Sequence, residues 1–292
     1  MENALELSHV SKRYGVGGFA LEDVSLTLPM GSIMGLVGAN GAGKSTTIGC
    51  MLGTLRPDAG TVRVFGQAMQ DSSTALRADI GVVYDGDNFP GYLTAAQLGR
   101  IFADTYARWD AALFDTYLAR FHLDRRQRIS RYSKGMTMAL AISAALAHHP
   151  KLLVLDEATS GLDPLVREDV LDLLLDFVTC EDHAILLSSH ITSDLEKIAD
   201  RLTFIHEGRV LLSEEKDTLR YRYGILRCRE AELAQFDSAD ILAWRRDVYQ
   251  TNVLVADRVA AARKYPGIVI DQAAVDEVMN LLVKGERHER IA

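Results

Sequence analysis

The chain has 292 residues, of which 48% are hydrophobic and 25% are charged. This length allows one large or two modest domains, and the composition excludes collagen-like, disordered and disulfide-stapled proteins. The formal net charge of −8 argues against a surface that binds duplex nucleic acid without sequence preference. We therefore expect no nucleic-acid partner. Three widely spaced cysteines predict reduced thiols rather than a zinc site or a disulfide framework.

The sequence predicts neither a signal peptide nor a membrane span. The first residues lack a basic head and a long apolar run. The longest apolar stretch, residues 136–147, is shorter than the roughly 20 residues that a transmembrane helix needs. We expect a cytoplasmic chain that can dock onto a membrane protein without spanning the membrane itself.

Hydrophobic periodicity predicts an α/β core preceded by antiparallel strands. Apolar and polar residues alternate over 4–10 and 20–28, which indicates two antiparallel strands with one solvated face. Residues 31–38, 151–156 and 184–188 are apolar on both faces, and helical patterns separate them, as in a buried parallel sheet. Residues 94–147 are predicted to be almost wholly helical. Residues 203–212 are predicted to form a hairpin that turns at Glu207-Gly208.

The pattern changes near residue 214. Beyond it, short strands are predicted at 224–228, 252–255 and 267–270, and helical pieces at 231–235 and 273–284. We therefore predict an α/β unit at 1–213, with a helical subdomain at about 94–147, and a small α+β accessory unit at 214–292. The accessory unit carries no recognisable site chemistry, and we expect it to support dimer contacts or regulation.

A glycine-rich loop follows the first buried strand. It satisfies the pattern G-x-x-x-x-G-K-[ST] between a strand and a helix, where backbone N–H groups and the helix dipole can surround a phosphate. We predict that Lys44 reaches the β- and γ-phosphates of ATP and that Ser45 ligates Mg²⁺. The predicted ATP-binding residues of this loop are Gly38, Asn40, Gly41, Ala42, Gly43, Lys44, Ser45 and Thr46. The alternative is a glycine-rich turn that matches the pattern by coincidence.

The second buried strand ends in two adjacent acids, Asp156 and Glu157. Adjacent carboxylates at a buried strand end are costly unless a cation lies beside them. We predict that Asp156 holds Mg²⁺ and that Glu157 orients the water that attacks the γ-phosphate. A strand that ends in solvated acids is the alternative, and the phosphate loop upstream disfavours it.

These motifs resemble those of the nucleotide-binding subunits of ATP-binding-cassette (ABC) transporters, over roughly residues 4–212. The resemblance also rests on Tyr132-Ser133-Lys134-Gly135-Met136, which precedes a helix of small apolar residues. The family has its signature loop there, usually Leu-Ser-Gly-Gly-Gln, so Lys134 and Met136 depart from the commonest form. The resemblance implies that Ser133 and Gly135 bind the γ-phosphate of the ATP held by the other protomer.

Further positions match the family in order. Ser160-Gly161-Leu162-Asp163 matches the D-loop, which crosses the dimer interface in the family. His190 matches the switch histidine that contacts the γ-phosphate, and Tyr14 matches the aromatic residue that stacks on adenine. The resemblance thus implies ATP contacts for Tyr14 and Asp163. It makes Glu157, His190 and Lys44 the expected catalytic residues, although an ordinary strand-end histidine and a surface tyrosine are the alternatives.

A further departure from the family concerns a predicted metal ligand. Most members have Gln where this chain has Asp85. A carboxylate can ligate Mg²⁺ directly or through water, but it cannot donate a hydrogen bond. We predict Asp85 as a metal ligand beside Ser45 and Asp156. The acidic segment resembles a branch that works with separate antibiotic- or drug-export permeases, and Trp109-Asp110 and the Ser-Lys-Gly-Met signature point the same way.

The resemblance implies an α/β P-loop fold of the ABC ATPase type, with an antiparallel β-subdomain. The expected activity is ATP hydrolysis with Mg²⁺, in a head-to-tail dimer with a second copy or a paralogue. The dimer would lie on the inner face of the cell membrane and drive a separate transmembrane permease, as an exporter. One alternative is a soluble ABC ATPase without a membrane partner, which the single set of ATP motifs and the lack of a coiled coil disfavour. The other is a regulatory ATP-binding module whose turnover Asp85 weakens.

Overall fold

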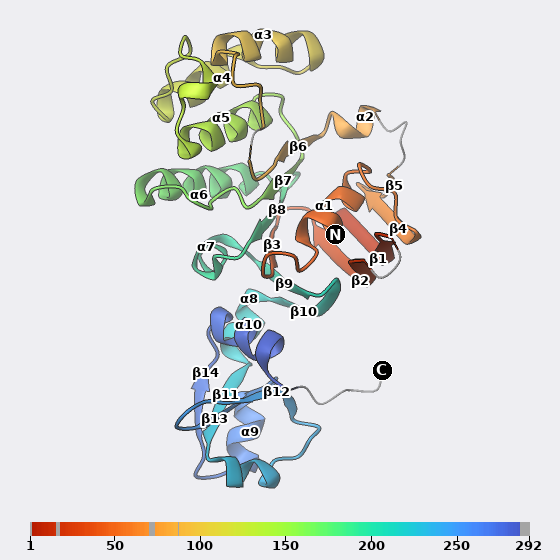
Figure 1. The fold of residues 1–292 in the computed structure, drawn as a ribbon, viewed down its shortest axis with the longest axis vertical. Helices are drawn as coiled ribbons and strands as arrows, with labels where there is room; N and C mark the ends of the chain where they lie inside the picture. The colour runs from red at the N-terminus through yellow and green to blue at the C-terminus, as the bar shows by residue number, and fades with distance from the viewer. Residues whose placement is uncertain (1, 16–17, 70–73, 87, 287–292) are drawn as a thin grey trace.

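Three sheets organise the computed structural model of the protein, which describes residues 2–15, 18–69, 74–86 and 88–286 (Figure 1). The first sheet has the order β2-β1-β4-β5, and its strands pair antiparallel. Its strands are β1 (Asn3–Arg13), β2 (Ala20–Pro29), β4 (Ala59–Val64) and β5 (Gln67–Ala68). Buried and exposed side chains alternate along β2. The predicted antiparallel pair with one solvated face is confirmed.

The central sheet has the order β10-β9-β3-β8-β7-β6. Its strands are β3 (Ile33–Val37), β6 (Ile80–Val83), β7 (Leu152–Asp156), β8 (Ala184–Ser189), β9 (Arg201–His206) and β10 (Arg209–Glu215). All its neighbours pair parallel except β9 and β10, which form the predicted hairpin at Glu207-Gly208. Because β3, β7 and β8 are parallel, their carboxyl ends lie at one edge of the sheet.

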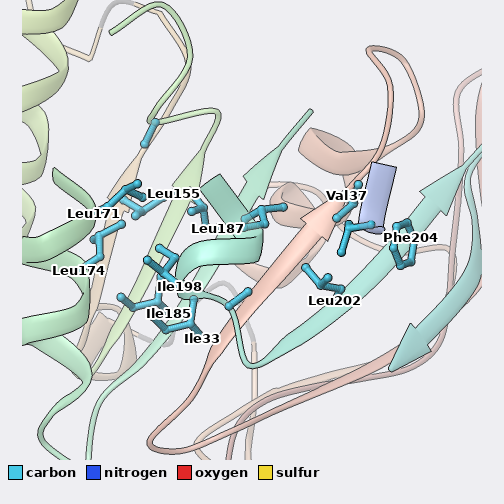
Figure 2. Close-up of a cluster of buried hydrophobic side chains, with 14 of the residues drawn as sticks. Ile33, Val37, Leu155, Leu171, Leu174, Ile185, Leu187, Ile198, Leu202 and Phe204 are labelled. Atoms are coloured by element: carbon cyan, nitrogen blue, oxygen red, sulfur yellow. The ribbon is translucent and has the colours of Figure 1, made fainter. Parts of the chain in front are cut away.

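Helices cover both faces of the central sheet. Helix α1 (Lys44–Met51) packs on one face, and α5 (Lys134–Leu146), α6 (Pro164–Val178) and α7 (Thr192–Ile198) pack on the other. Figure 2 shows Leu171 and Leu174 of α6 and Ile198 of α7 against side chains of the strands. Successive residues of β3 join opposite clusters, and therefore this strand is buried on both sides.

The helical region lies at one end of the molecule (Figure 1). It contains α3 (Ala95–Thr105), α4 (Ala111–Arg120), the short 3₁₀ helix η1 (Ile129–Arg131) and α5, and a further short helix, α2 (Thr74–Arg77), precedes it. The prediction of an almost wholly helical stretch was too broad, since residues 106–110 and 121–128 are not helical. Each long helix starts anew at a side-chain cap, provided by Thr94, Asp110 and Ser133.

The C-terminal residues form an antiparallel sheet with the order β12-β13-β11-β14. Its strands are β11 (Gly224–Cys228), β12 (Ile241–Arg246), β13 (Thr251–Val255) and β14 (Val269–Gln272). The helices here are α8 (Lys216–Tyr221), η2 (Glu230–Gln235), α9 (Arg258–Lys264) and α10 (Val275–Lys284). The sequence pattern did not predict α8, β12 or α9, and it placed β14 two residues too early.

Helix α10 joins the C-terminal sheet to the rest of the molecule. Its apolar side chains belong to the same buried cluster as Ile198 of α7 and Phe204 of β9. The predicted boundary near residue 214 falls inside β10, and the apolar core continues across it. None of the described helices is both long and apolar enough to cross a membrane.

Candidate ATP-binding and hydrolysis site

A cavity of about 350 Å³ opens where the central parallel strands end. Strand β3 runs into the glycine-rich loop, β7 ends at Asp156, and β8 ends just before His190. Most of the predicted phosphate and metal ligands line this cavity. It is lined by Phe19, Ala39, Asn40, Gly41, Gly43, Lys44, Ser45, Thr46, Asp85, Asp156 and Glu157.

The glycine-rich loop brings backbone close to the cavity. Gly43 is the N-cap of α1 and has a φ of 115°, in the left-handed region. A Cβ at this position would lie 2.9 Å from Leu21 Cδ2 and 3.0 Å from Phe19 Cζ, and only glycine fits without displacement. The N-terminus of α1 faces the cavity with its dipole and its free N–H groups, which is a favourable arrangement for an anion.

Lys44 is buried at the floor of this loop. Its Nζ donates hydrogen bonds to the carbonyl oxygens of Gly38, at 2.7 Å, and of Ala39, at 3.3 Å. The same Nζ lies 3.0 Å from Glu157 Oε1. The lysine therefore has a fixed position, and its charge is balanced by a buried acid until a phosphate competes for it.

Two serine hydroxyls hold the carboxylate of Asp156. Ser45 Oγ donates to Oδ2 at 2.7 Å, and Ser188 Oγ donates to Oδ1. The Ser188 oxygen also accepts the N–H of Glu157 at 3.2 Å. Ser188 was not among the residues predicted from the sequence. A polar residue within the fully buried strand β8 was the available signal.

Glu157 lies between a lysine and a histidine. Its φ is 53°, a left-handed conformation that costs a non-glycine residue about 1–3 kcal/mol. This backbone holds the buried carboxylate between Lys44, which contacts Oε1, and His190, whose Nδ1 lies 2.7 Å from Oε2. His190 thus meets Glu157 at the cavity, although it is not itself part of the lining.

Other predicted residues lie outside the cavity lining. Ser133 is the N-cap of α5 and accepts the N–H of Met136 at 3.2 Å, and Gly135 lies in the first turn of the same helix. Asp163 caps α6 in the same way. Gly38 and Ala42 support the loop from behind, since a Cβ on Gly38 would lie 2.6 Å from Ile205 O.

The aromatic residue that lines the cavity is Phe19, which sequence analysis missed. Tyr14 is exposed and is joined to Phe19 through its backbone N–H, which donates to Phe19 O at 3.0 Å. The start of β2 brings Phe19 beside Gly43. Phe19 lies just before the strand predicted at residues 20–28, and no motif in the sequence marks it as a site residue.

Asp85 pairs with Lys134, the residue after Ser133. Lys134 Nζ lies 3.3 Å from Asp85 Oδ1, and both side chains are about half exposed. The lysine also runs beside Gly161, where a Cβ would lie 3.3 Å from Lys134 Cδ. Two of the three departures from the family pattern, Asp85 and Lys134, are therefore partners, and Lys134 connects the cavity with the start of α5 and the D-loop.

Ser45 Oγ contacts Asp156 Oδ2, and Asp85 lines the same cavity, so the oxygen donors that Mg²⁺ prefers are available there. Within the described ranges no cluster of three or more His, Cys, Asp or Glu residues could hold a metal by itself. A magnesium ion in a nucleotide site usually has only one or two protein ligands, because phosphates and water supply the others.

Comparisons with known proteins agree with this geometry. Residues 21–160 match the family model described as ABC transporter. The chain is 33% identical over 213 residues to the bacitracin transport ATP-binding protein BcrA of Enterococcus faecalis, covering 72% of this chain and 69% of that protein. It is 34% identical over 213 residues to the Nod factor export ATP-binding protein I of Paraburkholderia xenovorans (strain LB400), covering 71% and 69%.

A solved structure described as an ATP-binding subunit of an ABC transporter has the same fold. It matches with a TM-score of 0.68 and 29% sequence identity, over 74% of this chain and 92% of that one. The phosphate loop, the buried acids and these similarities lead to one conclusion. The chain belongs to the ABC transporter family, as an ATP-binding and ATP-hydrolysing subunit.

Proposed function

We propose that this ATPase powers an exporter through a separate membrane permease, with each ATP held between two cassettes. One observation carries the hydrolytic part of the proposal: Lys44, Glu157 and His190 form a contiguous row beside Asp156 at one cavity. The names of the relatives, which concern bacitracin transport and Nod factor export, support the export direction. Bacitracin and Nod factor are named for those relatives, and neither is proposed as the cargo of this chain.

The phosphates of ATP would lie over the N-terminus of α1, where Lys44 exchanges its contact with Glu157 for the β- and γ-phosphates. Ser45, Asp156 and Asp85 would hold Mg²⁺, whose charge neutralises phosphate oxygens during transfer. Phe19 and Tyr14 lie on the side of the loop where the adenine would stack.

Hydrolysis is phosphoryl transfer to water, and its rate depends on positioning and electrostatics. Glu157 would accept a hydrogen bond from the attacking water once phosphate draws Lys44 away. His190 would hold the Glu157 carboxylate through Nδ1 and contact the γ-phosphate. The strained backbone of Glu157 supports this role, since such strain persists at sites where the surrounding structure fixes one geometry.

Ser133 and Gly135 carry the dimer part of the proposal. They lie at the start of a long helix and are not among the residues that line the cavity of their own chain, so the anion that they bind would come from a second copy or a paralogue. Asp163 would lie at the same interface. We place the ATPase unit at 1–213 and the accessory unit at 214–292, on the inner face of the membrane beside the permease.

The substitution Glu157→Gln tests the proposal, because it keeps the size of the side chain and removes the acceptor charge. Turnover should fall by a factor of about 10² or more, and ATP binding should persist. Size-exclusion chromatography with Mg²⁺ and ATP should then show a dimer that the wild-type chain forms more weakly. Glu168→Gln, an exposed acid on α6, is the matched control. Wild-type turnover in Glu157→Gln would remove Glu157 from the catalytic role.

A further inference from the structure

Two buried polar atoms face each other across helices α6 and α7 without a hydrogen-bond partner. They are Arg167 Nε and Asp194 Oδ2, and they lie 3.9 Å apart. The Asp194 side chain is only 3% exposed. A buried carboxylate is normally held by close hydrogen bonds, because its desolvation is expensive. The Arg167 side chain is 27% exposed, so the pair joins a partly exposed cation to a buried carboxylate that it does not contact closely.

Arg167 holds the end of the D-loop. Its Nη2 donates to Leu162 O at 3.3 Å, and its backbone N–H donates to Asp163 O at 3.0 Å. Upstream, the N–H of Ser160 donates to Glu157 O at 3.0 Å. The side chain of Arg167 is thus joined, through one short loop, to the backbone of Glu157.

Asp194 lies in the first turn of α7, which begins two residues after His190. His190 contacts Glu157 through Nδ1 at 2.7 Å. These connections form a closed loop of contacts. The backbone of the D-loop connects Glu157 with Arg167, and the Arg167 side chain faces Asp194. The backbone then connects Asp194 with His190, whose side chain contacts Glu157. Apolar side chains of α6 and α7 pack on the sheet (Figure 2), and Arg167 and Asp194 add a charged contact between the first turns of the two helices.

We propose that Arg167 and Asp194 are positioning residues for ATP hydrolysis. They hold the D-loop and the segment of His190 in register, so that the imidazole meets the Glu157 carboxylate. The inference rests on the roles of Glu157 and His190 proposed above. It assigns to the pair an effect on turnover and none on nucleotide affinity, because Lys44 and the glycine-rich loop do not contact either residue.

The double variant Arg167→Met/Asp194→Leu tests this inference. Replacing both partners of a buried ion pair with apolar residues generally preserves folding, whereas removing one partner strands a buried charge. We expect kcat to fall by about ten- to a hundredfold, since misplacement of a catalytic group by about 1 Å has effects of this size. The Kd of a fluorescent ATP analogue and the Tm should stay near those of the wild type. Asp194→Glu keeps the charge and gains the reach to close the gap, so it should retain most of the turnover.

Glu168→Gln/Lys197→Gln is the matched control. This pair joins the same two helices, but both of its side chains are exposed. Its removal should change kcat by less than about twofold, as for most surface ion pairs. A drop as large as that of the apolar double variant would mean that any link between α6 and α7 matters, and it would overturn the specific role of Arg167 and Asp194.

A His190→Ala background separates positioning from structure. If the pair acts through His190, the apolar double variant should lower kcat by less than about twofold once His190 is absent. An undiminished effect in that background would overturn the inference, and so would wild-type kcat of the double variant when His190→Ala is slow. Wild-type kcat in His190→Ala itself would instead overturn the proposed role of His190, and this inference with it.

Discussion

Removing helix α10 should unfold the ATPase core and not only the C-terminal sheet. The helix packs against α7 on one side and against β12 and β13 on the other. Its buried apolar side chains are Val275, Val278, Leu281 and Leu282. Each contributes about 1.5–3 kcal/mol by burial, together about 6–12 kcal/mol, which approaches the 5–15 kcal/mol net stability of a typical protein. A chain that stops before Val275 should therefore be aggregated or molten at room temperature.

A milder substitution gives a measurable change in the same contact. Val278 is fully buried, and Val278→Ala should lower the free energy of unfolding by about 2 kcal/mol. The Tm in a thermal scan by circular dichroism should fall by about 4–8 °C, as a single transition. Val248→Ala is the matched control, because Val248 is 88% exposed. The reasoning is refuted if the two variants have the same Tm, or if the chain without α10 keeps the Tm of the full chain.

Three further predictions concern the site and the helical region. Ser133→Arg should abolish cooperative hydrolysis while ATP affinity in equilibrium binding stays near wild type; a loss as large as that of Lys44→Ala would place Ser133 in the site of its own chain. Asp85→Asn should raise the Mg²⁺ concentration that gives half-maximal ATPase activity. Lys134→Met should lower this concentration, because the substitution frees the Asp85 carboxylate that the lysine contacts. If both variants shifted the concentration in the same direction, the result would contradict this pairing. Burial lowers the pKa of His148 below its usual 6.5, so the unfolded chain binds the proton at a higher pH than the folded chain. The wild type should therefore lose free energy of unfolding as the pH falls below 6.5, and His148→Gln should lose less. Parallel Tm curves of the two proteins between pH 7.5 and 5 would refute this.

Local sequence patterns determined much of the fold. The buried strands β3, β7 and β8 were predictable because both faces of each strand are apolar. Strands β1 and β2 were predictable because apolar and polar residues alternate along them. The glycine-rich loop was predictable because it satisfies the pattern G-x-x-x-x-G-K-[ST] directly after a buried strand. The acids at 156 and 157 followed from their place at a strand end. These features depend on neighbours in the chain, and so the sequence alone carries them.

The accessory region shows where local patterns stop being sufficient. Its strands β11 and β13 were predicted, but α8, β12 and α9 were missed, because their side chains are only partly apolar and their burial depends on the elements that they pack against. The continuity of the core across residue 214 was also hidden. The apolar face of α10 predicts burial, but not that α7 covers it.

The tertiary structure decided how the site is assembled. Lys44, Glu157 and His190 are far apart in the chain, and only the parallel register of β3, β7 and β8 brings them into contact. The pairing of Asp85 with Lys134 and the facing of Arg167 and Asp194 likewise depend on how helices pack on the sheet. Residue types and spacing show which chemistry is available. Distances between side chains arise only when burial of apolar surface fixes the elements against one another, and that is a property of the whole chain.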